Sequence, residues 1–228
     1  MPAYVWTKAI ATGTFLMMAV WHYLNDGLDA SSEMAGLITT LIFMGLTGGL
    51  LVKDIDRPDR FLYVLLRPQW KSWLVRGAYI ITGFGGLVSL KLLDNYLQLG
   101  FDWLWIPGLV FAGLGAVYTA FLFNQARARD LWQTPIQSAI HMLVHAIMAG
   151  SVLMMIIAPE SSQWMANILL WGIVANVVIM AKEILLPHDT PDTKKAIHLM
   201  TKGYYSKYFW AGIVMGSLIP LIVLNAFP

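Results

Sequence analysis

The amino-acid sequence predicts an all-α, polytopic integral membrane protein, a helical bundle of about seven transmembrane helices. Of its 228 residues 58% are hydrophobic and only 12% are charged, and the mean hydropathy is +0.63. A water-soluble domain of this size could not bury so much apolar surface. The apolar residues also form about seven runs of roughly 20 residues, the length that crosses a hydrocarbon core of ~30 Å, separated by short polar loops.

These apolar runs define the spans in chain order. The first, residues 5–24, has no small-residue cleavage site after it and is interpreted as a retained span. The other predicted spans cover residues 33–52, 72–93, 103–123, 136–157, 164–186 and 204–226. Before the last span, Pro191 and Asp192 are typical of a first helical turn. We therefore expect a short interfacial helix near residues 191–202.

The basic residues predict the orientation. By loop, 14 of the 15 Lys and Arg residues fall on one side, six of them in the Arg-rich loop 53–76, and only Lys91 falls on the other. Cytoplasmic loops carry the excess of Lys and Arg, so the N-terminus is expected in the cytoplasm. The net charge of +2 is thus explained by topology, and no nucleic-acid partner is expected.

A weak parallel internal repeat is also indicated. Residues 11–18 of the first span resemble residues 148–155 of the fifth, and residues 53–58 resemble residues 182–187. The first and fifth spans run in the same direction, so the chain divides into two parallel halves. These are a four-helix bundle, residues 1–135, and a three-helix half, residues 136–228, in which the last helix of the repeat is missing. The alternative is chance similarity between apolar segments.

Several motifs are spread from the second span to the last. Residues 54–61 read D-I-D-R-P-D-R-F and are followed by L-R-P; residues 118–122 read Y-T-A-F-L, residues 131–135 read L-W-Q-T-P, and an F-W…G…P pattern ends at Pro220. They resemble the D-x-x-R-P-x-R-F, L-R-P, Y-T-G-x-L-L and L-W-N-T-P motifs of the NrfD/PsrC family, the membrane subunits of polysulfide-reductase-like oxidoreductases. Members of that family usually have eight or more helices, from which the seven predicted here depart.

The resemblance implies a quinone-reactive membrane anchor subunit that binds menaquinone or ubiquinone in the first four-helix bundle. It further implies an iron–sulfur partner subunit that exchanges electrons with the quinone, and a larger catalytic subunit of molybdopterin type. Both are expected on the cytoplasmic side of a prokaryotic cytoplasmic membrane. The chain has no cysteine and cannot hold an iron–sulfur cluster, so its electrons must arrive from another subunit. The chain is then a non-catalytic or quinone-site subunit of the complex.

Polar side chains in the cytoplasmic half of the bundle are the candidates for the quinone site. Quinone reduction requires hydrogen-bond donors at the carbonyl oxygens and groups that exchange protons. The candidates are Lys8, Asp54, Arg57, Tyr118, Asn124, His141, His145 and Glu183. Tyr118 lies in the matched Y-T segment, where the resemblance implies a tyrosine that contacts quinone. The alternative is an aromatic side chain satisfied by a neighbouring helix.

Two histidines four residues apart, His141 and His145, share one face of the fifth span. They could exchange protons at the quinone site, form hydrogen bonds between helices without chemistry, or ligate haem. Two histidines four apart on one helix cannot be trans ligands of a single haem, so we expect neither haem nor metal in this chain. Glu183 could form an ion pair with Lys182 or Lys8, or conduct protons.

Two further functions remain open. A small transporter or proton-conducting membrane module is suggested by the parallel repeat and the ionisable residues within the spans. A scaffold that only anchors partner subunits is the third interpretation.

Overall fold

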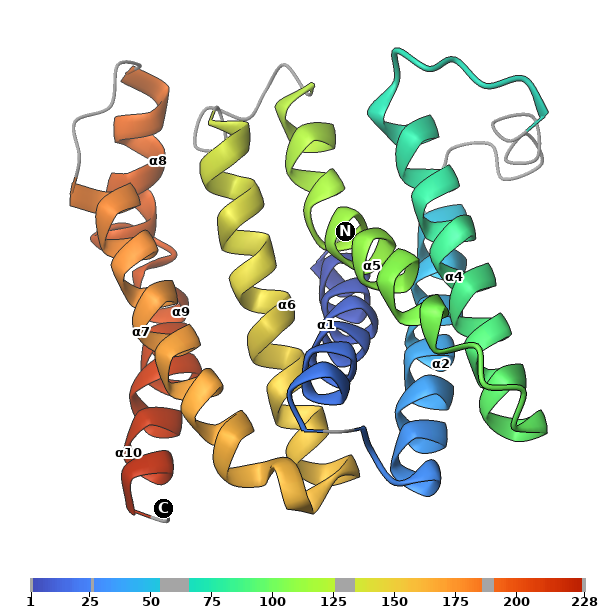
Figure 1. Ribbon diagram of the computed structural model, residues 1–228. Coiled ribbons are helices and arrows are strands. Elements are labelled where there is room, and N and C mark those ends of the chain that lie inside the picture. The colour runs from blue at the N-terminus through green and yellow to red at the C-terminus, as the bar shows by residue number, and fades with distance from the viewer. Residues whose placement is uncertain (1, 26, 54–65, 126–133, 186–190, 227–228) are drawn as a thin grey trace.

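A computed structural model describes residues 2–25, 27–53, 66–125, 134–185 and 191–226. Within these ranges the chain is helical and contains no strand. Seven of the described helices are long and apolar enough to cross a membrane, and Figure 1 shows them side by side in one bundle. The predicted class, an all-α bundle of about seven transmembrane helices, is confirmed.

The helices match the predicted spans in order and to within a few residues. The first six spans are α1 (Pro2–Leu24), α2 (Ala30–Lys53), α4 (Trp73–Leu97), α5 (Trp105–Asn124) after the 3-10 turn η2 (Asp102–Leu104), α6 (Pro135–Ile157), and α7 (Ser162–Leu185) after the 3-10 turn η4 (Pro159–Ser161). The seventh span is built from α9 (Ser206–Ile213), the π-helical turn η5 (Val214–Leu218) and α10 (Ile219–Ala226). The short helix α8 (Pro191–Thr201) lies where a short helix was expected; its position in the membrane interface stays a prediction.

The start of α2 shows how a cap sets a helix boundary. Asp29 accepts hydrogen bonds from the Ser31 hydroxyl and, at 3.0 Å, from the backbone N–H of Ser32. These bonds satisfy donors that a helix N-terminus leaves unpaired, and they lower the pKa of Asp29 to about 2. The helix therefore begins at Ala30, three residues before the apolar run that predicted it.

Helix α1 is the centre of the bundle and packs against α2, α5 and α6. At its crossing with α6 the two backbones touch, because a Cβ on Gly13 would lie 1.8 Å from the carbonyl oxygen of Ala146. A Cβ on Gly150 would likewise lie 2.1 Å from the carbonyl oxygen of Gly13. Small residues at such a crossing allow close helix packing in membranes. Gly13 and Gly150 are also the two glycines that correspond in the predicted repeat.

The two ends of the bundle differ in charge. In Figure 1 the ends of α2, α5 and α7, together with α8, lie at the upper end, while α4 and α10 finish at the lower end. Described cations near the upper end include Lys53, Arg67, Lys71 and Lys182, whereas Lys91 lies near the lower end of α4. Which end faces the cytoplasm stays a prediction.

The seventh span is the least embedded part of the fold. Neither α9 nor α10 contains a buried residue, and within η5 only Ser217 is buried. The π-helical turn comes directly before Pro220, which lacks a backbone N–H and clashes with the preceding turn of a regular helix. This span leaves an open space beside α1 and α6 that becomes the candidate site.

Candidate functional site

Lys8 is a buried cation in the middle of the bundle. Its side chain comes from the first third of α1 and only 1% of the residue is exposed. The ammonium group donates hydrogen bonds to the carbonyl oxygen of Ala116, at 2.9 Å, and to the hydroxyl of Thr119, both on α5. It also lies 4.8 Å from the ring centre of Tyr118. A buried cation stays charged at low cost only with such partners, so α5 holds Lys8 in place.

Tyr118 of α5 packs against Lys8. The tyrosine is 2% exposed. Its ring packs directly on Gly77 of α4, because a Cβ added to Gly77 would lie only 2.2 Å from a ring carbon of Tyr118. Its hydroxyl is buried and has no hydrogen-bond partner among the described residues. Burying a hydroxyl without a hydrogen-bond partner costs free energy. A ligand that forms a hydrogen bond with Tyr118 would therefore stabilise this arrangement.

The histidine pair of α6 is held by one amide of α7. His141 and His145 place their Nε2 atoms 2.8 Å and 2.9 Å from the side-chain oxygen of Asn176. An amide oxygen only accepts, so both imidazoles donate through Nε2. The rings meet edge to face, with centroids 4.6 Å apart. Asn176 was not among the predicted site residues; an amide within an apolar span was the signal that could have found it.

Glu183 lies at the opposite side of His141. Its carboxylate oxygen Oε1 is 3.7 Å from Nδ1 of His141 and accepts a hydrogen bond of 3.4 Å from the side chain of Gln137. The acid therefore contacts the histidine pair, while the ammonium group of Lys8 turns toward α5.

A cleft of about 860 Å³ opens between α1, α6, α7 and the seventh span. Its side chains with polar groups are Trp6, Lys8, His141, His145, Asn176, Tyr208 and Ser217, and the rest of its wall is apolar. His141 is buried, whereas His145 is exposed toward the open side. Trp6 at the rim is 63% exposed. The cleft is thus an apolar space with hydrogen-bonding groups at one place in its wall, a composition typical of sites for small organic ligands.

The structure brings only part of the predicted set together. Lys8, His141 and His145 line the cleft, Glu183 contacts His141, and Tyr118 touches Lys8 from behind without lining the cleft. Asn124 is exposed at the end of α5, outside the cleft wall. Asp54 and Arg57 lie outside the described residues.

A second buried charged cluster lies at the other end of the bundle. Lys91 of α4 is 2.7 Å from the carboxylate of Asp94, 3.4 Å from that of Glu33 on α2, and 3.6 Å from that of Asp102. Trp105 lies beneath the ammonium group, 5.2 Å from ring centre to nitrogen. These contacts join α2, α4 and the start of α5. In the sequence Lys91 served only as a topology marker, and this cluster was not predicted.

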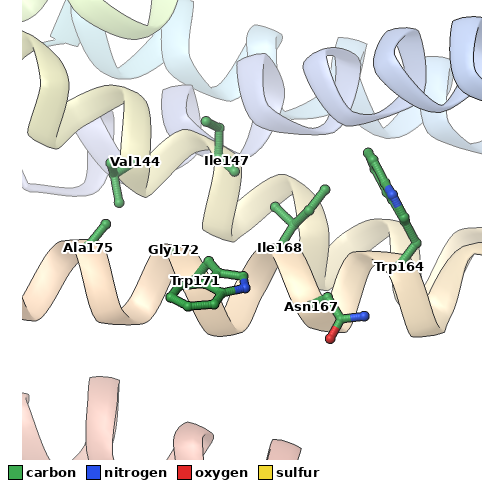
Figure 2. A pocket seen from close by; sticks show the side chains of 8 residues that line it. All are labelled: Val144, Ile147, Trp164, Asn167, Ile168, Trp171, Gly172 and Ala175. Carbon is green, nitrogen blue, oxygen red and sulfur yellow. The ribbon is translucent and has the colours of Figure 1, made fainter.

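A smaller apolar groove of about 380 Å³ lies between α6 and α7. Figure 2 shows its wall, in which Trp171 and Trp164 stand on α7 with Asn167 between them. None of the residues that line it can exchange a proton at neutral pH. Within the described residues, no group of three or more His, Cys, Asp or Glu side chains could hold a metal ion.

The seven spans and the cleft define an integral membrane protein with a ligand-sized space inside its bundle. The model of the family described as "Polysulphide reductase, NrfD" matches residues 3–228. The chain belongs to this family, as its motifs suggested, and is therefore a membrane subunit of the kind that works with other redox subunits. No curated protein and no solved structure matches the chain.

Proposed function

We propose that this chain is the quinone-reactive membrane anchor subunit of a multisubunit oxidoreductase. It exchanges electrons between an iron–sulfur partner subunit and the membrane quinone pool, menaquinone or ubiquinone. A molybdopterin-type subunit carries the chemistry of the soluble substrate. Family membership supports this assignment, and so does the absence of cysteine from the chain, which leaves the iron–sulfur chemistry to a partner.

The cleft is the observation that carries the proposal. It lies between α1 and the second half of the chain, not within the first four-helix bundle in which the resemblance implied the quinone. A quinone has a flat polar head and a long apolar tail, so its site needs hydrogen-bond donors next to an apolar opening toward lipid. The cleft offers Lys8, His145 and Asn176 in one region and residues such as Met148, Val152 and Ile173 beyond them. Its volume of about 860 Å³ falls in the range of roughly 300–1,000 Å³ of small-molecule sites.

Each polar residue has a definite task in this proposal. His145 in its protonated form donates a hydrogen bond from Nδ1 to one quinone carbonyl oxygen, while Asn176 orients both imidazoles through its amide oxygen. The charge of Lys8 stabilises the negative charge that the quinone oxygens acquire when electrons arrive. Tyr118 lies against Lys8. Its hydroxyl, which has no hydrogen-bond partner among the described residues, serves the head group when the ligand reaches deeper than the cleft.

The partner is proposed to dock at the end of the bundle that carries the basic residues. Arg67, Lys71 and Arg76 are exposed just before and within the start of α4. The guanidinium of Arg76 is fixed by a hydrogen bond of 2.6 Å to the carbonyl oxygen of Trp70 and lies over the ring of Trp73. This face suits an acidic protein surface.

The transporter interpretation gains no support from the interior of the first bundle. Between the Lys8 contacts and the Lys91 cluster, the described core contains Phe15, which packs on Phe84 and Trp105 at centroid distances of 5.3 Å and 5.2 Å. These rings are fully buried. Ions and protons need polar groups or water along their route, and the rings of this layer offer one polar group, the buried indole N–H of Trp105.

Photolabelling with an azido-substituted short-chain ubiquinone tests the proposal. In the purified chain we expect label in peptides of α6 and α7 and competition by decyl-ubiquinone. Ala149→Phe fills the cleft and should abolish the label. Ala175→Phe, the same substitution in the groove of Figure 2, is the matched control and should leave the label in place. Labelling that persists both in the presence of decyl-ubiquinone and in Ala149→Phe would refute a quinone site in the cleft.

A further inference from the structure

A second, smaller chamber adjoins the cleft. It has a volume of about 150 Å³, and Ile197, Met200 and Thr201 of α8 form part of its wall. Glu183 of α7 lines this chamber but not the cleft. His141 lines both spaces and is the only titratable residue that does so among the described residues. The imidazole therefore lies, together with Met180 and Phe209, between the chamber at the end of the bundle and the cleft inside it.

The two nitrogens of this imidazole face opposite ways. Nε2 is fixed by Asn176 at 2.8 Å, on the wall of the cleft. Nδ1 is buried, makes no hydrogen bond within the described structure, and faces the carboxylate of Glu183 at 3.7 Å. Gln137 holds that carboxylate from α6. An imidazole that takes up a proton at one nitrogen and releases one from the other is a natural proton carrier.

The charged groups around His141 fit this role. On α7 the carboxylate of Glu183 favours the arrival of a proton, and on α6 the neighbouring His145 competes for it. From α1, Lys8 lines the same cleft, and its positive charge favours release of the proton toward the quinone. The wall formed by α8 contributes no charged side chain to the chamber.

We propose that Glu183 and His141 form a proton-delivery route from the chamber under α8 to the quinone in the cleft. The proposal rests on the proposed quinone function. In the direction of reduction, a quinone takes two electrons from the reduced iron–sulfur partner and two protons, which gives the quinol. Glu183 passes a proton to Nδ1 of His141, and the imidazolium turns its Nε2–H from Asn176 to a quinone oxygen and releases that proton there. The neutral imidazole then carries its proton on Nδ1, and rotation of the ring returns an N–H to Asn176 before the second proton is delivered. Quinol oxidation runs the same route in reverse.

The test uses the chain in the complex with the subunits that copurify with it. Glu183→Gln and His141→Gln keep a hydrogen-bonding side chain and remove the titratable group. We expect each variant to lower decyl-ubiquinone turnover by roughly tenfold or more and to raise the solvent deuterium isotope effect. Glu160→Gln, at an exposed acid of the other end, is the matched control and should behave as wild type.

Two measurements separate a proton route from a structural effect. The azidoquinone label should stay in α6 and α7 of both variants, and added formate or azide, small weak acids that can enter the chamber, should restore part of the turnover of Glu183→Gln. Full turnover in Glu183→Gln, or a loss that comes with loss of label and is not rescued, overturns the route. If the wild-type chain itself takes no label, it is the quinone proposal that fails.

Discussion

The crossing of α1 and α6 gives the sharpest stability prediction. In Gly150→Ala the new methyl group would lie 2.1 Å from the carbonyl oxygen of Gly13 and 2.8 Å from the backbone nitrogen of Thr14, whereas ordinary contacts begin at 3.4 Å. Both neighbours are backbone atoms, so no side-chain rotation can relieve the overlap. The two helices would have to move apart.

The expected cost is large because α1 also packs against α2 and α5. Moving α1 away from α6 strains those contacts as well. Overpacked cores lose about 1–3 kcal/mol, and we place Gly150→Ala at the upper end, about 3 kcal/mol. Gly48→Ala on α2 is the matched control, since its Cβ would meet no atom within 4 Å. Alanine is the better helix former by up to ~1 kcal/mol, so this variant should not lose stability.

The assay is unfolding of the purified chain in mixed micelles, followed by circular dichroism as the fraction of denaturing detergent rises. We expect the midpoint to fall for Gly150→Ala and to stay or rise for Gly48→Ala. Equal midpoints for the two variants would refute the backbone contact between α1 and α6.

Three other outcomes are expected. Lys91→Met leaves buried carboxylates unpaired and should cost about 3–5 kcal/mol in the same assay, while Lys207→Met, at an exposed site, should cost almost nothing. Tyr118→Phe should raise the stability of the quinone-free chain, because the hydroxyl has no hydrogen-bond partner among the described residues. The same variant should lower quinone turnover in the complex by roughly 2–10-fold, the equivalent of one lost hydrogen bond. A fall in stability would instead show that the hydroxyl bonds to another group of the protein. In this cysteine-free chain, Gln163→Cys should react with an impermeant thiol reagent in intact cells and Gln69→Cys should not; the reverse would invert the predicted topology.

The sequence determined the spans and the family. The length of an apolar run is a property of the chain alone, since the bilayer fixes how many residues a helix needs. The seven helices therefore appear where the runs predicted them, and the motifs after the second span and around Tyr118 identified the family that residues 3–228 match. The positions of His141 and Glu183 along their helices also followed from sequence, because each residue of a helix adds a fixed rise.

The neighbours of each side chain were decided by the tertiary structure. Helical spacing places His141 and His145 on one face but does not say which helix that face meets; the answer, Asn176, depends on the rotation of α6 against α7. In the same way, Lys8 turned toward α5 and put Tyr118 behind it, away from the cleft. The rotation of each helix and the angles at which helices cross are set by packing among all the helices together. The residue pattern of one helix does not specify them.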